Sequence, residues 1–374
     1  MRKNIAIIEN HIISTNTVRQ RLTLALIDAG YNVTVLSTGT EKELEIARLK
    51  GFTVIDIGTS NTKPGEVLQY MKKLRNALRQ TQADVALTFT MRPAIWGNMV
   101  ARRLKIPVIT NITGIGPLAE NKSIVYQVAR LLYMFVLNKT ARVFFQNNDD
   151  ASLFLEKKFV RPEQVEIIPG SGVDYEYFSP RPKKRTDEKF VFLFISRLIA
   201  DKGILEYVEA ARRVKEQYDN KVEFQILGPY YSQNLKENTI TQKQIVEWVE
   251  QGIVKYLGAV NDVRDDIADA DCIVLPSYRE GMSNVLLEAG SMEKPCITSN
   301  TTGCADIVID KVTGLLCKPR SADDLTAKII DMLHLPEAER IQMGKKAREV
   351  VKTKFAKQIV IDAYFKAIRE ITEK

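Results

Sequence analysis

The chain has 374 residues, of which 45% are hydrophobic and 27% are charged, and no segment is of low complexity or repeated at a fixed period. This composition excludes a disordered or repeat protein, and the length favours two domains because one core rarely organises so many residues. The formal net charge of +8 is uneven: residues 1–182 carry 24 Lys and Arg against 16 Asp and Glu, whereas residues 183–374 carry 30 Lys and Arg and 30 Asp and Glu. The basic half predicts an anionic partner such as nucleic acid, phospholipid or a phosphorylated acceptor, or serves solubility alone.

We expect neither a signal peptide nor a membrane-spanning helix. The two cations near the N-terminus precede an apolar run of only four residues, which predicts a buried strand. The longest apolar candidate for a spanning helix, Ile124–Leu137, is interrupted by Arg130. The four cysteines match no zinc spacing, so we expect reduced thiols in a cytosolic protein.

Short apolar strands alternate with amphipathic helices through the first half, which predicts a parallel sheet covered on both faces. Strands are predicted at Asn4–Glu9, Asn32–Ser37, Val85–Thr90, Val108–Asn111, Val143–Gln146 and Glu163–Pro169. Helices are predicted at Thr17–Ala29, Gly65–Gln80, Ala94–Leu104 and Ser123–Lys139. The last of these strands leads into a glycine turn, Gly170–Asp174.

Residues 180–189 carry two prolines and a run of charges, which is typical of a linker. Strands are then predicted at Phe190–Ile195, Val222–Leu227, Val254–Leu257, Cys272–Pro276, Pro295–Thr298 and Gly314–Cys317. Helices are predicted at Lys202–Gln217, Val263–Ala268, Asn284–Met292, Ala322–His334, Ala338–Thr353 and Gln358–Thr372. We therefore expect an α/β chain with two doubly wound domains at 1–179 and 190–355, followed by a last helix at 356–374. Such sheets bind ligands outside the carboxyl ends of their strands, so these ends should carry the site.

The strongest chemical signal is the loop and helix after the fourth strand of the second half. Glu280 lies in the loop, and Gly281 lets the backbone approach a ligand. Ser283 or Asn284 is a plausible N-cap, and the first-turn amides of the helix suit a diphosphate. Carboxylates suit hydroxyl groups better than phosphates, which assigns Glu280 to a sugar hydroxyl and Glu288 to a ribose diol. Acidic residues near the positive end of a helix are also common without any ligand.

Weaker signals lie at other strand ends. Arg197 and Lys202 follow a predicted strand, where two cations could neutralise a diphosphate leaving group or simply lie on a surface loop. Gly228 directly follows the next strand. The loop Thr113–Pro117 could contact donor or acceptor, although a simple turn explains it at least as well. The glycine turn at 170–174 could shape the site, but such a turn more often has no further role.

Several chemistries are argued against by missing motifs. The chain has only two histidines, no G-x-S-x-G elbow and no GxxxxGK[ST] loop. The turn after the first strand contains no glycine, so it lacks a nicotinamide dinucleotide fingerprint. No carboxylate cluster has metal-ligand spacing.

Taken together, these residues resemble the family-four retaining glycosyltransferases of the GT-B fold over nearly the whole chain. The resemblance rests on four features in order, namely the turn with Val173 and Asp174, the cations Arg197 and Lys202, the E-x7-E pair Glu280 and Glu288, and a C-terminal helix. The stretches Phe144–Asp150 and Thr113–Gly116 look like the bacterial subgroup that builds capsule, O-antigen and lipid-linked oligosaccharides. Two departures are that many members have a histidine at Thr113 and a glycine-rich loop at Asn10–Asn16.

The resemblance implies two Rossmann-like domains facing across a cleft, with the last helix crossing back onto the first. It implies a UDP-sugar donor, bound mainly by the second domain, and no metal or other cofactor. The residues implied in catalysis are Arg197, Lys202 and Glu280. The other donor-side residues are Gly228, Gly281, Met282, Ser283, Asn284, Val285 and Glu288, and those on the acceptor side are Asn10, His11, Thr113, Gly114 and Gly116. A retaining front-face reaction needs no protein nucleophile, since the leaving phosphate can accept the acceptor's proton.

The basic first domain then suggests an acceptor linked to polyprenyl diphosphate at the inner face of the cell membrane. Its cations could dock on an anionic bilayer together with the apolar helix Ser123–Lys139, each contributing about 1 kcal/mol. These cations are Lys72, Lys73, Arg75, Arg79, Arg92, Arg102, Arg103 and Lys105. Core packing is the simpler expectation for the apolar helix.

Two other functions remain open from the sequence. A UDP-sugar epimerase could share this architecture, but it needs acid-base side chains that a chain with two histidines supplies poorly. A nucleic-acid binder would interleave aromatic residues with its cations, and only Tyr70 and Trp96 lie near them. We therefore expect no nucleic-acid partner.

Overall fold

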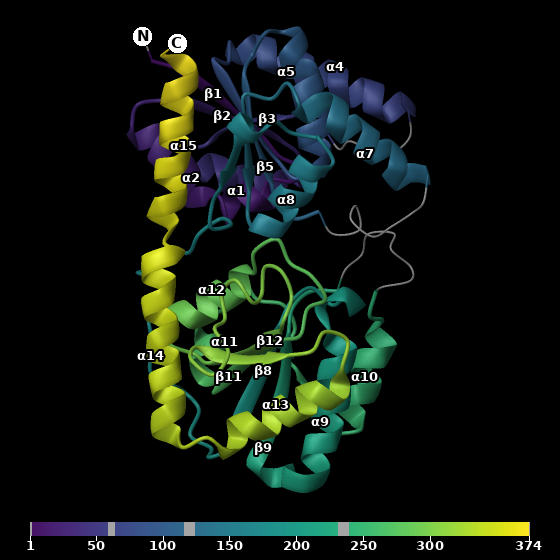
Figure 1. The fold of residues 1–374 in the computed structure, drawn as a ribbon, viewed down its shortest axis with the longest axis vertical. Helices are drawn as coiled ribbons and strands as arrows, with labels where there is room; N and C mark the ends of the chain where they lie inside the picture. Colours follow the sequence, from purple (N-terminus) through teal and green to yellow (C-terminus); the bar gives the residue numbers. More distant parts are fainter. Residues whose placement is uncertain (1, 59–63, 116–123, 231–238, 374) are drawn as a thin grey trace. The chain divides into compact units, whose positions relative to one another are not determined.

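The structure is a computed structural model that describes residues 2–58, 64–115, 124–230 and 239–373 (Figure 1). The chain divides into two compact units. The first comprises Met1–Ser171 and Lys357–Lys374, and the second comprises Gly172–Ala356. Each unit is an α/β layered structure built on one parallel sheet, as the sequence predicts.

The first unit holds a seven-stranded sheet in the order β3-β2-β1-β4-β5-β6-β7, with every pairing parallel. The strands are β1 (Asn4–Ile8), β2 (Asn32–Ser37), β3 (Thr53–Asp56), β4 (Val85–Phe89), β5 (Val108–Ile112), β6 (Arg142–Phe145) and β7 (Val165–Ile167). Alternate residues of β1 pack into different cores. Ile5 and Ile7 pack beneath α2 (Gln20–Asp28) and α15 (Lys357–Thr372). Ala6 and Ile8 pack beneath α4 (Pro64–Thr81) and α5 (Asn98–Arg103). Both faces of the sheet are therefore covered, as a buried parallel sheet requires.

The helices of the first unit are α1 (Ile13–Asn16), α2 (Gln20–Asp28), α3 (Glu41–Leu49), α4 (Pro64–Thr81), α5 (Asn98–Arg103), α7 (Ile124–Leu137), α8 (Asn148–Glu156) and α15 (Lys357–Thr372). The helix predicted at Thr17–Ala29 begins three residues later, as α2. The short helix α1 lies before the predicted range, and residues 17–19 form the turn between the two helices. The helix predicted at Ala94–Leu104 begins as a π-helical turn, Pro93–Gly97, before α5.

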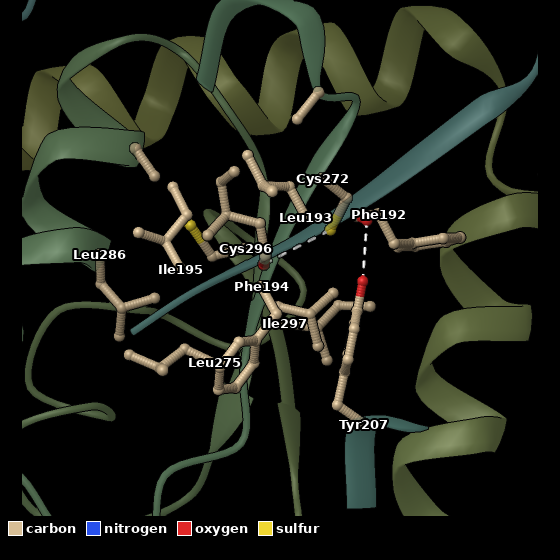
Figure 2. Close-up of a cluster of buried hydrophobic side chains, with 14 of the residues drawn as sticks. Phe192, Leu193, Phe194, Ile195, Tyr207, Cys272, Leu275, Leu286, Cys296 and Ile297 are labelled. Atoms are coloured by element: carbon tan, nitrogen blue, oxygen red, sulfur yellow. Dashed lines mark hydrogen bonds between the residues drawn. The ribbon is translucent and has the colours of Figure 1, made fainter. Parts of the chain in front are cut away.

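The second unit holds a six-stranded parallel sheet in the order β10-β9-β8-β11-β12-β13. The strands are β8 (Phe190–Ile195), β9 (Val222–Leu227), β10 (Lys255–Tyr256), β11 (Cys272–Leu275), β12 (Cys296–Ser299) and β13 (Gly314–Cys317). Figure 2 shows the apolar side chains of β8, β11 and β12 packed around the sheet, where the Tyr207 hydroxyl donates to the Phe192 carbonyl at 2.8 Å. All four cysteines are buried free thiols of this unit.

The helices of the second unit are α9 (Ile204–Tyr218), α10 (Gln242–Glu250), α11 (Arg264–Asp269), α12 (Asn284–Ser291), α13 (Ala322–His334) and α14 (Glu337–Lys354). The helix predicted from Lys202 begins two residues later. A 3-10 turn at Ala200–Lys202 ends in Gly203, whose left-handed backbone (φ 75°) redirects the chain into α9.

The segment between the two sheets lies on the second unit. The sequence predicts that the first domain ends at residue 179 and that residues 180–189 form a linker. In the structure, residues 172–189 belong to the second unit. Val173 is buried in that unit's core and its amide donates to the Phe355 carbonyl. Arg185 pairs with Asp271, so the charge run is docked and not a free linker. A sequence shows a run of charges but not the partners that pair with it.

The last helix belongs to the first unit, as predicted. α15 packs against α2 and β4, and its Tyr364 is buried in their shared core. Arg142 at the start of β6 pairs with Glu370 of α15 at 2.6 Å. Across the described part of the chain, no helix combines the length and apolar character needed to span a membrane.

Candidate active site

The loops after β8 and β9 meet through a glycine. The Ser196 amide donates to the Leu227 carbonyl at 3.1 Å, and the Leu198 amide donates to the Pro229 carbonyl at 3.1 Å. A Cβ atom at Gly228 would lie 1.8 Å from the Ser196 carbonyl oxygen, closer than any two such atoms can approach. Gly228 therefore allows the loop that carries Arg197 to contact the end of the neighbouring strand directly.

The loops after β8 and β11 meet in the same way. A Cβ atom at Gly203 would lie 2.1 Å from the Pro276 carbonyl oxygen. The Tyr278 amide and the Ser277 hydroxyl both donate to the Asp201 carbonyl, at 2.9 and 3.3 Å. This contact places the Lys202 turn directly beside the loop that carries Glu280.

Lys202 and Glu280 form an ion pair at this contact. The Lys202 ammonium lies 2.5 Å from Glu280 Oε1, and the two side chains are only 15% and 14% exposed. Partial burial strengthens such a pair relative to one in water. The two charges of this pair neutralise each other.

The Glu280 loop also joins the loop after β12. The Glu280 amide donates to the Thr302 carbonyl at 3.2 Å, and the Ser283 amide donates to the Gly303 carbonyl at 3.1 Å. A Cβ atom at Gly303 would lie 2.5 Å from the Glu280 carbonyl oxygen. No sequence motif identifies Thr302 or Gly303, although a glycine shortly after a buried strand is a usable signal.

The start of α12 completes this edge of the sheet. Ser283 is the N-cap, and its hydroxyl accepts from the Leu286 amide at 3.4 Å. The amides of Asn284 and Val285 in the first turn are not needed for intrahelical bonds and can serve an anion. Met282 and Val285 pack partly buried against the core. Gly281 is half-buried, and Glu288 lies half-buried one turn further along the helix.

An aromatic side chain that the sequence analysis missed lies at the same edge. The Tyr278 hydroxyl donates to Glu206 at 2.8 Å, and the Arg320 guanidinium lies 4.2 Å from the Tyr278 ring centroid. Cys304 is buried nearby, and burial raises the pKa of its thiol to about 12. It is therefore a poor nucleophile at neutral pH. Within the described residues, no group of three or more His, Cys, Asp or Glu is placed to hold a metal ion.

The acceptor-side residues predicted from the sequence lie at strand ends of the first unit. Asn10 follows β1, and its amide donates to the Thr90 hydroxyl after β4 at 3.0 Å. The His11 ring accepts from the Ile13 amide at 3.4 Å, and its other nitrogen lies 3.7 Å from a Glu43 oxygen. Thr113 and Gly114 follow β5, Gly114 with a left-handed backbone (φ 115°). Gly116 lies outside the described residues.

A buried ion pair supports the loop after β1. Arg19 Nε lies 3.2 Å from a Glu9 oxygen, with the two side chains 9% and 2% exposed. The Thr15 hydroxyl donates to Glu9 at 3.0 Å, and the Arg19 guanidinium lies 4.1 Å from the Phe89 ring centroid. Burial raises the pKa of Glu9, and the Arg19 charge opposes that rise. This pair is not predictable from the sequence, because neither residue belongs to a recognisable motif.

Both halves of the chain match family models of sugar-transferring enzymes. Residues 15–170 match the model described as glycosyl transferase 4-like domain, and residues 178–350 match the model described as glycosyl transferases group 1. The chain is a glycosyltransferase of the family-four type. The resemblance predicted from the Glu280–Glu288 segment and its partners is thereby confirmed.

This glycosyltransferase resembles two curated enzymes. It is 25% identical over 332 residues, 84% of each chain, to the N,N'-diacetylbacillosaminyl-diphospho-undecaprenol alpha-1,3-N-acetylgalactosaminyltransferase of Campylobacter jejuni. It is 29% identical over 271 residues to the UDP-Gal:alpha-D-GlcNAc-diphosphoundecaprenol alpha-1,3-galactosyltransferase of Escherichia coli, a match that covers 69% of this chain and 68% of the other.

Solved structures confirm the fold. The HepE protein of Anabaena, solved in complex with UDP and glucose, superimposes with a TM-score of 0.81 at 17% identity, covering 98% of this chain and 99% of that one. The glycosyltransferase therefore has the GT-B fold with its two Rossmann-like units. That the units face each other across a cleft stays a prediction.

Proposed function

We propose that this glycosyltransferase moves a hexose or N-acetylhexosamine from a UDP-sugar to a saccharide linked to polyprenyl diphosphate. The observation that carries the donor assignment is the Lys202–Glu280 pair beside the amino end of α12. The two curated relatives act on undecaprenyl-diphosphate acceptors by name, and the Anabaena neighbour was solved with UDP. These relatives support assembly of a bacterial surface polysaccharide or a related glycan as the setting.

The diphosphate of the donor would lie against Arg197, Lys202 and the first-turn amides of α12. When it binds, Lys202 exchanges its carboxylate partner for a phosphate oxygen, and Glu280 is released to accept from a sugar hydroxyl. Glu288 lies a turn further along α12 and is assigned to the ribose diol. Each group thus meets the chemistry that it suits, cations to phosphate and carboxylates to hydroxyls.

We propose a retaining reaction that uses neither a protein nucleophile nor a metal ion. The bond from the anomeric carbon to the UDP oxygen breaks, the acceptor hydroxyl oxygen bonds to that carbon on the same face, and its proton passes to the leaving phosphate. Arg197, Lys202 and the helix amides would stabilise the charge that develops on the phosphate.

The test is a transfer assay with a panel of UDP-sugars and a short-chain polyprenyl-diphosphate saccharide in detergent. We expect a product extended by one sugar, with the anomeric configuration of the donor in its NMR spectrum and an unchanged rate in EDTA. An inverted product or an EDTA-sensitive rate would overturn the corresponding part of the mechanism. Absence of transfer across the panel would overturn the whole proposal, and conversion of the UDP-sugar without acceptor would identify an epimerase.

We also propose that the protein works at the inner face of the cell membrane, where such acceptors are made. The support lies in α7. Tyr133, Val136 and Leu137 on one face of this helix are buried, which agrees with the expected core packing. Apolar residues of its opposite face remain exposed, and the basic residues of α5 lie close by. A helix can therefore pack on the core and still present an apolar surface.

A further inference from the structure

A cavity of about 500 Å³ lies in the first unit between α5 and α7. Val108 and Ala141, at the amino ends of β5 and β6, form part of its wall. The acceptor-side residue Thr113 lies beyond the opposite end of β5. A strand rises about 3.3 Å per residue, so roughly 15 Å separates the cavity from that edge of the sheet. The cavity is therefore a different place from the candidate active site.

Four cations line this cavity. Arg102 and Arg103 end α5, Lys105 follows them, and Lys139 follows α7; all four are exposed. The lining residues that the structure describes include no Asp or Glu. Two cations in the last turn of a helix are common because they complement the helix dipole. Four cations that line one cavity from two helices are more than the helix dipole explains.

Lys105 occupies a position that glycine usually takes. Its backbone is left-handed (φ 59°), and the Ile106 amide donates to the Ala101 carbonyl at 2.9 Å in the bond that closes the end of α5. A left-handed backbone is unfavourable for a residue with a Cβ atom. Lys105 therefore places a positive charge at the rim of the cavity, although its left-handed backbone is less favourable than that of a glycine at the same position.

Apart from Asn98, the remaining wall is apolar, and it continues onto an exposed stripe of α7. Phe135 lines the cavity, is 61% exposed, and lies 5.8 Å from the Arg102 guanidinium. Val128, Leu131 and Met134 are exposed on the same face of the helix, at 49%, 61% and 41%. An exposed apolar stripe beside a group of cations matches an amphipathic anion. The charged group of such a ligand would lie in the cavity, and its acyl chains would lie along the helix.

We propose that the cavity binds the phosphate headgroup of an anionic phospholipid while the exposed stripe of α7 lies among the acyl chains. The ligand is a structural lipid of the bilayer and not the saccharide acceptor, because the cavity lies at the amino edge of the sheet and the acceptor-side residues lie at the carboxyl edge. This inference rests on the proposed peripheral location of the protein. It does not depend on which sugar or acceptor the enzyme uses.

The test compares binding of the full-length protein to sedimented vesicles of phosphatidylcholine with and without phosphatidylglycerol. We expect binding only with phosphatidylglycerol, and a loss of roughly tenfold or more in the double variant Arg102→Glu/Lys139→Glu. The variant Leu131→Ser should weaken binding without changing the charge. The matched controls are Lys345→Glu/Lys346→Glu on α14 and Leu49→Ser on α3, which change exposed residues of other helices and should bind like the parent.

Four outcomes would overturn the inference. The first is equal loss in the Lys345/Lys346 control, which would mean that total charge decides binding. The second is full competition by soluble glycerol phosphate, which would make the cavity a site for small anions. The third is an increased KM of the cavity variant for a detergent-solubilised acceptor, which would make the cavity part of the acceptor site. The fourth is binding that is unaffected by the cavity variant while its thermal unfolding matches the parent.

Unchanged transfer to the detergent-solubilised acceptor by the cavity variant would support the inference. If the parent protein transfers no sugar at all but its vesicle binding still requires Arg102 and Lys139, the inference stands and the proposed function fails. The two failures are thus distinguishable, because vesicle binding is measured without any reaction.

Discussion

In the second unit, three glycines bring the loops after neighbouring strands into direct backbone contact, whereas in the first unit the loops after β1 and β4 are joined through polar side chains. Gly203, Gly228 and Gly303 each leave no room for a Cβ atom against the next loop. In the first unit, Asn10 reaches Thr90 through a single hydrogen bond. Backbone contacts hold a loop in one position, while side-chain contacts can be exchanged.

The difference fits the two substrates that we propose. The nucleoside diphosphate is the same in every UDP-sugar, so a binding site formed by rigid backbone suits it. Acceptor saccharides differ between pathways, so a surface of exchangeable side chains suits them. The comparison predicts that changes in the second unit affect stability and donor use strongly, and that changes in the first affect acceptor use more mildly.

The largest effect is expected from Gly228→Ala. The new Cβ atom would lie 1.8 Å from a backbone oxygen, so the strand ends must separate, and we expect a loss of about 3 kcal/mol or more in the free energy of unfolding. Urea unfolding can be followed by Trp248 fluorescence in a Trp96→Phe background, since Trp248 is partly buried in the second unit.

Gly252→Ala is the matched control for that experiment. Gly252 also has a positive φ (67°, compared with 148° at Gly228), but no atom lies within 4 Å of its Cβ position. It should lose only about 1 kcal/mol. Equal losses in both variants would show that backbone strain, and not contact between the loops, explains the glycines.

The next effect is expected from Lys202→Ala. Removing the cation that we propose faces the leaving diphosphate should lower kcat by roughly 100- to 1000-fold, because such a charge would act mainly in the transition state. The measurement is the transfer assay with donor and acceptor saturating. Lys345→Ala, an exposed lysine of α14, should leave the rate unchanged. A Lys202→Ala enzyme with the parent rate would remove Lys202 from the donor site.

A milder effect is expected from Asn10→Ala. Loss of its hydrogen bond to Thr90 should raise the KM for the acceptor by about three- to tenfold and leave the KM for the UDP-sugar unchanged. Asn32→Ala is the control, since Asn32 makes a similar bond to Asn4 at the amino edge of the sheet. If the two KM values rose together, the contrast between a donor unit and an acceptor unit would fail.

The smallest effect concerns the far end of α12. Burial lowers the pKa of Lys294 from 10.5 to about 8, and its ammonium donates to the Ala268 and Ala270 carbonyls at 2.6 and 2.7 Å. Between these two pKa values the unfolded chain binds more protons than the folded one, so the contribution of Lys294 to stability rises with pH.

Lys294→Met should therefore reduce the rise of the unfolding free energy between pH 8 and pH 10.5, relative to the parent. Urea unfolding across that range, followed by Trp248, measures it. The exposed Lys345→Met provides the control. An identical pH dependence in the parent and in Lys294→Met would show that the lysine titrates normally and that the helix end is more open to water than its burial implies.

The sequence by itself determined most elements whose signal is local. Strands β8, β9 and β13 have the predicted bounds. β8 and β13 are continuous apolar runs that end at a polar residue, as expected of buried parallel strands, and β9 alternates apolar with polar residues and ends at Gly228. Ser283 was among the predicted N-caps because capping depends on residues within one turn. Helix α3 was missed although Thr40 and Glu43 form a capping box, since most of its residues are charged and few are buried.

Only the tertiary structure decided which distant residues meet. Lys202 and Glu280 are 78 positions apart and become neighbours because β8 and β11 are adjacent in the sheet. The buried pair of Glu9 and Arg19, the docking of residues 172–189 and the cavity between α5 and α7 have the same origin. Residue types and spacing specify what each segment can do locally, but strand order and packing determine which charges end up paired.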